Sequence, residues 1–342
     1  MAFLKNNIIK LLEELGIYQI EYPTPFPQAG NVYSYIIPGI NNNYILFDAG
    51  LKWENNEELF FNFIKEKNID INSISDIYLS HGHVDHYGLA KIINDKSGAK
   101  VYIHEKDKNK ISDDYNKNYV KESGKYINFF KRYGLDDTTV EFIINTGKGL
   151  NYFTNQIKDI DTLLGGEKID SGFGELEVVY LPGHTPGSIG LYNKKNKILF
   201  SGDSLLAKIS PNPIVELGKA GEEDRFKSLP VYYNTLDKMY NMDIDLVIPG
   251  HGECIINHQR TIENLKHFYK RRQEKILNVL SEEMTVYEIS VTLFPKYKEQ
   301  IFLIFSEILG NIDILEEMGY VEKIDFGNKI AYRRKTDELV VI

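Results

Sequence analysis

The sequence predicts an α/β domain followed by a second, smaller domain at the C-terminal end of the chain. Three observations support this prediction. After a first segment of strands and turns, strand-like and helix-like apolar patterns alternate from the strand that ends at Asp48 to His104, as they do in α/β domains. Residues 268–342 change to three helical patterns followed by a short hairpin. A chain of 342 residues is also long for one compact domain.

Turn residues bound the predicted elements of the first domain. A strand over 18–22 is interrupted by the prolines of residues 23–27 and resumes over 31–37, and a polar turn then leads to a strand that ends at Asp48. The apolar periods predict further helices over 57–66 and 87–93, and strands at 77–79, 100–104, 176–180, 198–200 and 246–248.

The stretch His81-Gly82-His83-Val84-Asp85-His86 lies between a predicted strand and a predicted helix. Four groups that can bind a metal fall within six positions, in a chain with only eight histidines. Neutral imidazole and carboxylate suit Zn(II) and other borderline first-row metals. Spacing this dense predicts a metal site in the loop between strand and helix.

Three further ligand-type residues follow strand-like runs later in the chain: His184, Asp203 and His251. Each is flanked by glycine or proline, which let the backbone turn sharply at the end of a strand. Any one of them alone is compatible with an ordinary turn. Together with the first motif, in this order, they predict one composite site.

This order of motifs resembles the metallo-β-lactamase-fold hydrolase superfamily over about the first 265 residues. Pro-Gly-His-Thr-Pro-Gly-Ser at 182–188 and Pro-Gly-His-Gly at 249–252 are similar to the glyoxalase II and LACTB2-like branches. The resemblance implies a four-layer αβ/βα sandwich with the site at one edge, between two sheets. True antibiotic-destroying enzymes of the B1 type would carry cysteine where this chain has Asp203.

The resemblance also implies the role of each residue in a site with two divalent metal ions. One ion would be held by His81, His83 and His184, the other by Asp85, His86 and His251. Asp203 would bridge them, because two dications so close repel each other strongly. Zn²⁺ is the default metal, and iron or manganese fits the same ligands.

In that site a metal-bridging hydroxide would attack the substrate. Asp85 is the expected catalytic residue, since beside its metal it could pass a proton to the leaving group. Asp48 would orient a ligand loop through hydrogen bonds, with turn capping as its alternative role.

Residues 1–267 are the expected catalytic domain, interrupted by a helical insertion over 105–168. Helices are expected there at 107–116, 120–133, 137–145 and 152–157. An insertion of this length between two metal-binding motifs predicts a lid. Its aromatic residues would form either a substrate wall or the insertion's own core: Tyr119, Tyr126, Phe129, Phe130, Tyr133, Phe142, Tyr152 and Phe153.

Residues 268–342 resemble the winged-helix domain that the LACTB2-like branch carries at this place. Helices are expected from 269 to 280, from Thr285 and over 300–318, with hairpin strands at 319–324 and 330–333. Basic residues are fewer than acidic ones in residues 271–342, so a DNA-reading role is not expected. Packing against the catalytic domain, or a homodimer contact, is the expected role.

Composition narrows the class of partner and the compartment. The net charge of −9 disfavours a non-specific nucleic-acid binder, although it leaves room for a nuclease, where the metals dominate the local charge. Cys254 is the single cysteine, so an intrachain disulfide is excluded and a reducing, cytoplasmic location is expected. Residues 1–16 carry acids and resemble no signal peptide, and no apolar run approaches the ~20 residues of a membrane span.

These observations favour a dinuclear metal-dependent hydrolase acting on a small ester-like substrate: a thioester, lactone or ester. The alternative is a metal-dependent endoribonuclease or phosphodiesterase, which would use cations near the metals, with Lys208, Arg225 and Lys227 as candidates. A purely structural metal site is disfavoured. Structural zinc sites are closed by four protein ligands each, whereas seven residues shared between two ions would leave a coordination position open on each ion.

Overall fold

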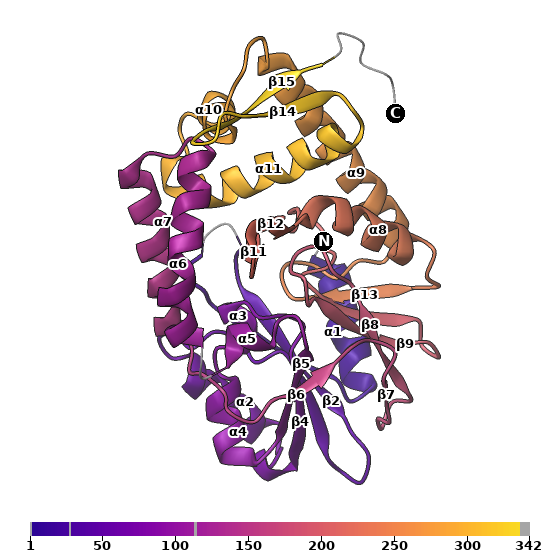
Figure 1. Ribbon diagram of the computed structural model, residues 1–342. Coiled ribbons are helices and arrows are strands. Elements are labelled where there is room, and N and C mark those ends of the chain that lie inside the picture. Colours follow the sequence, from indigo (N-terminus) through magenta and orange to yellow (C-terminus); the bar gives the residue numbers. More distant parts are fainter. Residues whose placement is uncertain (1, 27–28, 113–114, 336–342) are drawn as a thin grey trace. The chain divides into compact units, whose positions relative to one another are not determined.

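The computed structural model describes residues 2–26, 29–112 and 115–335 (Figure 1). The chain forms two compact units. The first contains residues 1–116, 150–211 and 237–261, and the second contains residues 117–149, 212–236 and 262–342. The helix α9 (His258–Val279) runs without a break across the predicted domain boundary at 267 and 268, and that boundary stays a prediction.

The first unit contains a six-stranded sheet in the order β1-β2-β3-β4-β5-β6. The first three strands pair antiparallel and the last four pair parallel. The strands are β1 (Tyr18–Tyr22), β2 (Val32–Pro38), β3 (Tyr44–Phe47), β4 (Ile74–Tyr78), β5 (Lys100–His104) and β6 (Asp161–Leu163). Parallel pairing needs crossover connections, which contain α2 (Asn56–Glu66), α3 (Val84–Tyr87) and α4 (Ala90–Ser97).

A second, five-stranded sheet in the same unit has the order β13-β10-β9-β8-β7. Its strands are β7 (Lys168–Ile169), β8 (Leu176–Tyr180), β9 (Ile189–Asn193), β10 (Ile198–Gly202) and β13 (Leu246–Pro249). β8 and β10 are both antiparallel to β9, and β13 is parallel to β10. Three strands, β8, β10 and β13, therefore run in one direction and end at the same edge of the sheet.

Two apolar clusters hold the first unit together. One lies between the two sheets, where Phe200 of β10 packs edge-on against Tyr35 and Phe47 of the other sheet at ring-centroid distances of 5.5 and 6.0 Å. The other buries Phe60 of α2 and Ile93 of α4 against the first sheet. Two facing sheets with helices on the outside are the αβ/βα sandwich predicted from the sequence, so the fold class is confirmed.

The second unit is built around its own core. Its elements include α6 (Tyr115–Arg132), α7 (Asp137–Gly149), β11 (Glu216–Gly218), β12 (Gly221–Phe226), α8 (Ser228–Tyr240), α9, α10 (Val286–Leu293), α11 (Ile301–Glu317), β14 (Val321–Asp325) and β15 (Ile330–Arg334). Residues 237–240 of α8 and 258–261 of α9 are counted with the first unit. Phe129, Phe130 and Tyr133 pack on Phe305 of α11 and are at most 3% exposed.

The two roles predicted for the aromatic residues of the insertion were a substrate wall and the insertion's own core. These three residues do lie in a core, but it is one shared with α11 rather than the insertion's own. Phe142 and Tyr152 are exposed, and the side chain of Tyr119 lies outside the described residues.

One insertion helix is wrong as predicted. Residues 152–157 form the end of a 3₁₀ turn, η2 (Leu150–Phe153), and then an irregular segment. Tertiary hydrogen bonds replace helical ones there, because the amide of Lys52 donates to the carbonyl of Phe153 and that of Ile157 donates to Ile111. The first predicted helix is also shorter than expected, with α5 confined to Lys108–Ile111.

The C-terminal elements match their sequence signals more closely. Thr285 caps α10, accepting a hydrogen bond from the amide of Glu288 while the Glu288 carboxylate accepts one from the amide of Thr285. The predicted third helix and hairpin are present as α11, β14 and β15. In the described ranges, none of the helices is long and apolar enough to cross a membrane.

Candidate metal centre

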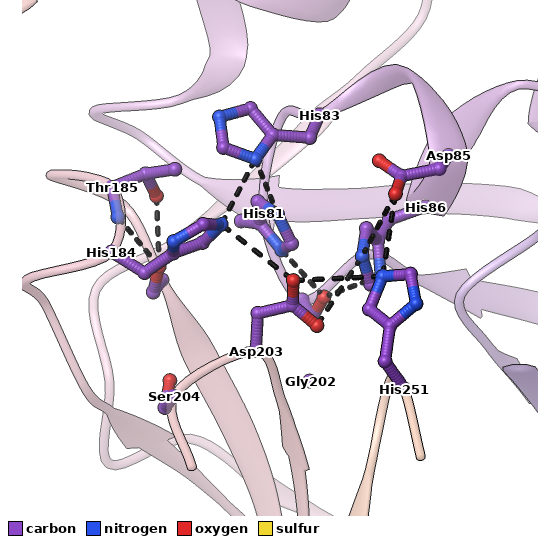
Figure 2. A network of polar contacts seen from close by, with 12 residues as sticks. His81, His83, Asp85, His86, His184, Thr185, Gly202, Asp203, Ser204 and His251 are labelled. Carbon is purple, nitrogen blue, oxygen red and sulfur yellow. Dashed lines mark hydrogen bonds and ion pairs between the residues drawn. The ribbon is translucent and has the colours of Figure 1, made fainter. Parts of the chain in front are cut away.

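The ligand-type side chains lie where strands of both sheets end. β4 leads into the loop with His81 and His83, and the sequence 181–188 after β8 carries His184. Asp203 directly follows β10, and His251 follows β13 by two residues. Since β8, β10 and β13 end at one edge, their side chains converge with those that follow β4, as Figure 2 shows. Asp85 and His86 belong to the short helix α3 rather than to the predicted loop.

Three histidines form the first cluster. His81 Nε2 lies 2.9 Å from His83 Nδ1, and His184 Nε2 lies 3.0 Å from the same atom. The three ring nitrogens face one another (Figure 2) and form a group suited to one ion. Ligands about 2.0–2.1 Å from a tetrahedral zinc lie roughly 3.3 Å apart, so the observed spacing is close to that of a metal site.

Asp85, His86 and His251 form the second cluster. His251 Nε2 lies 3.3 Å from Asp85 Oδ2, and His86 Nε2 lies 3.9 Å from the same oxygen. Six of the seven residues proposed from the sequence are therefore brought together in two adjoining groups.

Asp203 reaches both clusters. Its Oδ1 lies 3.5 Å from His86 Nε2, and its Oδ2 lies 3.6 Å from His251 Nε2 and 3.7 Å from His184 Nε2. Gly250 allows this approach, since a Cβ there would come within 2.6 Å of both Asp203 Oδ1 and His86 Cε1.

Two buried atoms at this junction, His86 Nε2 and Asp203 Oδ1, make no hydrogen bond, although they lie 3.5 Å from each other as an ion pair. A buried polar atom without a partner is costly. Both atoms point into the space between the clusters, and both are ligand atoms for divalent metals. The residues present therefore fit divalent metal ions.

Electrostatics differ between the two clusters. Burial, reinforced by the neighbouring imidazoles, lowers the pKa of His83 to about 3 and that of His81 well below its usual value. His81 and His83 thus present neutral imidazole lone pairs, the form that binds metal.

The second cluster contains anions. Burial opposes the charged forms of Asp85 and Asp203, but His86 and His251 outweigh it and hold the pKa of both carboxyls below the usual range. The same carboxylates raise the pKa of His86 and His251 against the effect of burial. Buried anionic carboxylates need positive charge beside them.

Asp48 supports the site from the end of β3. Its Oδ1 accepts a hydrogen bond from the amide of Ser80 (2.7 Å), and its Oδ2 binds the Ser80 hydroxyl (2.8 Å) and His86 Nδ1 (2.8 Å). The Ser80 hydroxyl in turn lies 3.0 Å from His81 Nδ1. These hydrogen bonds agree with the orienting role predicted for Asp48. The Asp48 backbone is left-handed, with φ of 59°.

Asp107 contacts the site loops and was missed in the sequence. It is fully buried and binds Gly82, Lys110, Thr185 and Gly187. It begins a lysine-rich turn without a recognisable motif, so only its position three residues after β5, in the parallel part of the six-stranded sheet, could have drawn attention to it.

The cations proposed for a phosphodiester substrate have other partners. Lys208 pairs with Glu253, and Arg225 and Lys227 belong to the second unit, where they pair with Asp313 and Glu317. A different basic residue, Lys110, has its side chain close to Gly82 of the first motif. Cys254 is half-buried beside the core between the sheets.

The fold and this site define a metal-dependent hydrolase of the two-sheet type, and comparison with known proteins agrees. The sequence profile described as Metallo-beta-lactamase superfamily matches residues 27–251. The chain belongs to the metallo-beta-lactamase superfamily. It is 28% identical over 329 residues to the probable metallo-hydrolase YqjP of Bacillus subtilis, covering 93% of this chain and 97% of that protein.

Solved structures share the fold over nearly the whole chain. The metallo-beta-lactamase family protein TTHA1429 from Thermus thermophilus has a TM-score of 0.79 at 24% identity, covering 94% of this chain and 99% of that one. A beta-lactamase domain protein from Burkholderia ambifaria has a TM-score of 0.76 at 19% identity, covering 94% and 92%. These structures show the fold, and the family match together with the metallo-hydrolase relative shows that the chain is an enzyme of a hydrolytic superfamily.

Proposed function

We propose that this enzyme binds two divalent ions, Zn²⁺ in the first place, and hydrolyses a small ester-like substrate: a thioester, lactone or ester. The observation that carries the proposal is Asp203, whose two oxygens reach the histidines of both clusters. A carboxylate in that position can bridge two ions. In this assignment His81, His83 and His184 hold one ion, and Asp85, His86 and His251 hold the other.

Two divalent cations held by these residues would lower the pKa of a water molecule toward neutrality and would polarise a carbonyl or phosphoryl oxygen. The chain's own groups supply the rest. The Asp48 carboxylate fixes the ring of His86 through Nδ1 and leaves Nε2 directed at the site.

Asp85 is the proposed proton carrier. Its side chain is 14% exposed, whereas that of His86 beside it is fully buried, so Asp85 has access to a bound substrate. Its Oδ2 lies 3.3 Å from His251 Nε2. A carboxylate in this position can take a proton and pass it to the leaving group as the ester bond breaks.

Two features support a small substrate over a polymer. The net charge is −9, which disfavours polyanions in general. The cations considered for a phosphodiester are each held by a carboxylate: Lys208, Arg225 and Lys227. Phosphodiester cleavage by an endoribonuclease or phosphodiesterase is the alternative that the experiment below includes.

The finer assignment rests on the sequence motifs and the C-terminal elements. Pro-Gly-His-Thr-Pro-Gly-Ser at 182–188, together with three helices and a hairpin at the C-terminal end, supports the LACTB2-like branch with a winged-helix-like domain over 268–342. A cytoplasmic location is supported by the single cysteine. The role of residues 105–168 as a lid that sets substrate size stays a prediction.

The test is metal analysis followed by a substrate screen. The purified protein should contain two equivalents of metal, and the His184→Ala variant fewer. Both proteins are then assayed on acyl thioesters, lactones, aryl esters, bis(p-nitrophenyl) phosphate and single-stranded RNA. Turnover of an ester-like compound by the wild type alone supports the proposal. A protein without bound metal refutes it, and metal-dependent cleavage of RNA or phosphodiester alone establishes the alternative.

A further inference from the structure

Asp107 connects the two loops that supply the three-histidine cluster. It follows β5 by three residues and is fully buried. One carboxylate oxygen, Oδ2, accepts hydrogen bonds from the amide of Gly82 (2.9 Å) and the hydroxyl of Thr185 (2.7 Å). The other, Oδ1, accepts from the amide of Gly187 (3.1 Å) and from Lys110 Nζ (2.9 Å).

The partners of Asp107 stand next to proposed ligands. Gly82 lies between His81 and His83, and Thr185 directly follows His184. One carboxylate therefore joins the loop after β4 to the loop after β8, within one residue of all three histidines. The two loops come from different sheets, and the register within a sheet does not fix the distance between them.

The contact is tightly built around the carboxylate. A Cβ at Gly187 would come within 2.7–2.8 Å of the Asp107 side chain and its amide nitrogen, so the loop after β8 can approach this closely only with glycine there. The Thr185 hydroxyl also lies 2.8 Å from the Ser188 hydroxyl, which accepts a hydrogen bond from the amide of Thr185. The loop is thus tied to Asp107 at two of its residues, Thr185 and Gly187.

Lys110 compensates the buried charge. Its Nζ lies 2.9 Å from Asp107 Oδ1, and the pair keeps a carboxylate in a place where an uncompensated one would be strongly destabilising. Charge-assisted hydrogen bonds to fixed backbone amides are stronger and more directional than neutral ones. The arrangement suits a residue that fixes distances.

We propose that Asp107 is a positioning residue for the three-histidine cluster: by clamping Gly82 to Thr185 and Gly187, it sets the distance of His184 from His81 and His83. The inference rests on the proposed function, in which this cluster binds one of two metal ions. It predicts an effect on that ion alone, since the four hydrogen bonds of Asp107 described above go to the loops after β4 and β8 and to α5.

Asp107→Asn is the informative variant. An amide has one oxygen where the carboxylate has two, and its NH₂ group would face donors of the same kind at Gly187 and Lys110. Loss of such an orienting contact typically lowers metal affinity by roughly 10–100-fold. The test is to measure the Zn²⁺ affinity of the full chain by competition with a chromophoric chelator. Asp107→Asn is compared with its parent in the wild type and in two single variants, His251→Ala and His184→Ala.

In the His251→Ala background, where the three-histidine cluster is intact, Asp107→Asn should weaken zinc binding by about 10–100-fold. In the His184→Ala background, where that cluster is already broken, it should have no further effect. Asp95→Asn, which removes an exposed carboxylate paired with Lys91, is the matched control and should bind zinc as the wild type does.

If Asp107→Asn fails to fold, Thr185→Val and Thr185→Ser replace it. The first removes the hydroxyl that binds Asp107 and should weaken the same ion, and the second keeps the hydroxyl and should not. An equal loss of affinity in both backgrounds, or no loss in either, overturns the inference while leaving the proposed function intact. Failure of the wild type to bind zinc overturns the proposed function itself.

Discussion

Replacing Asp48 by asparagine should disable His86 as a ligand without disturbing the fold. The Asp48 carboxylate accepts from the amide of Ser80 through Oδ1 and binds His86 Nδ1 through Oδ2. This contact keeps the proton of His86 on Nδ1 and leaves Nε2 free for a metal. Asparagine tolerates the left-handed backbone at this position, so backbone strain does not enter.

The size of the expected loss in zinc affinity follows from the hydrogen bonds that the new side chain could make. With its oxygen toward the amide of Ser80, the new asparagine side chain would direct its NH₂ group at His86 Nδ1, which would then have to be the acceptor and send its proton to Nε2. With the amide reversed, two donors would meet at Ser80. The first outcome withdraws Nε2 as a ligand atom, and the second leaves one buried donor unsatisfied, at about 1–3 kcal/mol, or roughly 5- to 150-fold in zinc affinity at the second cluster.

The assay is zinc competition against a chelator, with thermal unfolding of the metal-free protein measured beside it. The expected result is one zinc bound as tightly as in the wild type and the other weakened within that range. Two zinc ions bound with wild-type affinity would refute the tautomer argument. Equal weakening of both ions would mean that Asp48 acts on the two clusters alike, through Ser80 and His81.

Four further outcomes are expected. Asp85→Ala should abolish turnover of any identified substrate while the melting curve of the metal-free protein stays unchanged; wild-type turnover would exclude Asp85 as proton carrier. Stripping metal with a chelator should lower the melting temperature, and Zn²⁺ at 100 times its dissociation constant should restore about 2.7 kcal/mol per site; an unchanged temperature would argue against binding at the native site. Thr285→Ala should lower the free energy of unfolding by about 1 kcal/mol, because it removes the cap of α10. Denaturant unfolding measures this loss, and Thr285→Ser is the control that keeps the cap. Arg225→Met should lower the free energy of unfolding by about 3–5 kcal/mol, because it leaves Asp313 buried without its partner. A loss below about 1 kcal/mol, measured by the same denaturant unfolding, would show that water screens the pair.

The site could be predicted because its signals are local. His81, His83, Asp85 and His86 lie within six positions, and His184, Asp203 and His251 each follow an apolar strand with glycine beside them. Strand direction then brings them together, because β8, β10 and β13 end at one edge. The apolar period predicted most strands of both sheets for the same reason, since apolar period and turn residues are properties of short segments. It did not predict β6, β7 or β9, and β6 lies inside the segment expected to be a helical insertion.

Contacts between distant segments could not be predicted. Asp107 joins loops that are 25 and 78 positions away, and nothing in its own neighbourhood distinguishes it from a surface aspartate. Phe129, Phe130 and Tyr133 show an apolar helix face, but the sequence does not reveal what that face packs against. In the structure their partner is Phe305 of α11, far along the chain.

The division of the proposed ligands between two sheets gives the metal a part in holding the protein together. His81 and His83 follow a strand of the six-stranded sheet, whereas His184, Asp203 and His251 follow strands of the five-stranded one. An ion bound by both groups would act as a cross-link across a long stretch of chain, in a protein whose single cysteine offers no intrachain disulfide. Scarcity of metal would then first loosen the seam between the sheets, exposing backbone amides to exchange and peptide bonds to proteases. The cell's supply of zinc would set the lifetime of this enzyme as well as its activity.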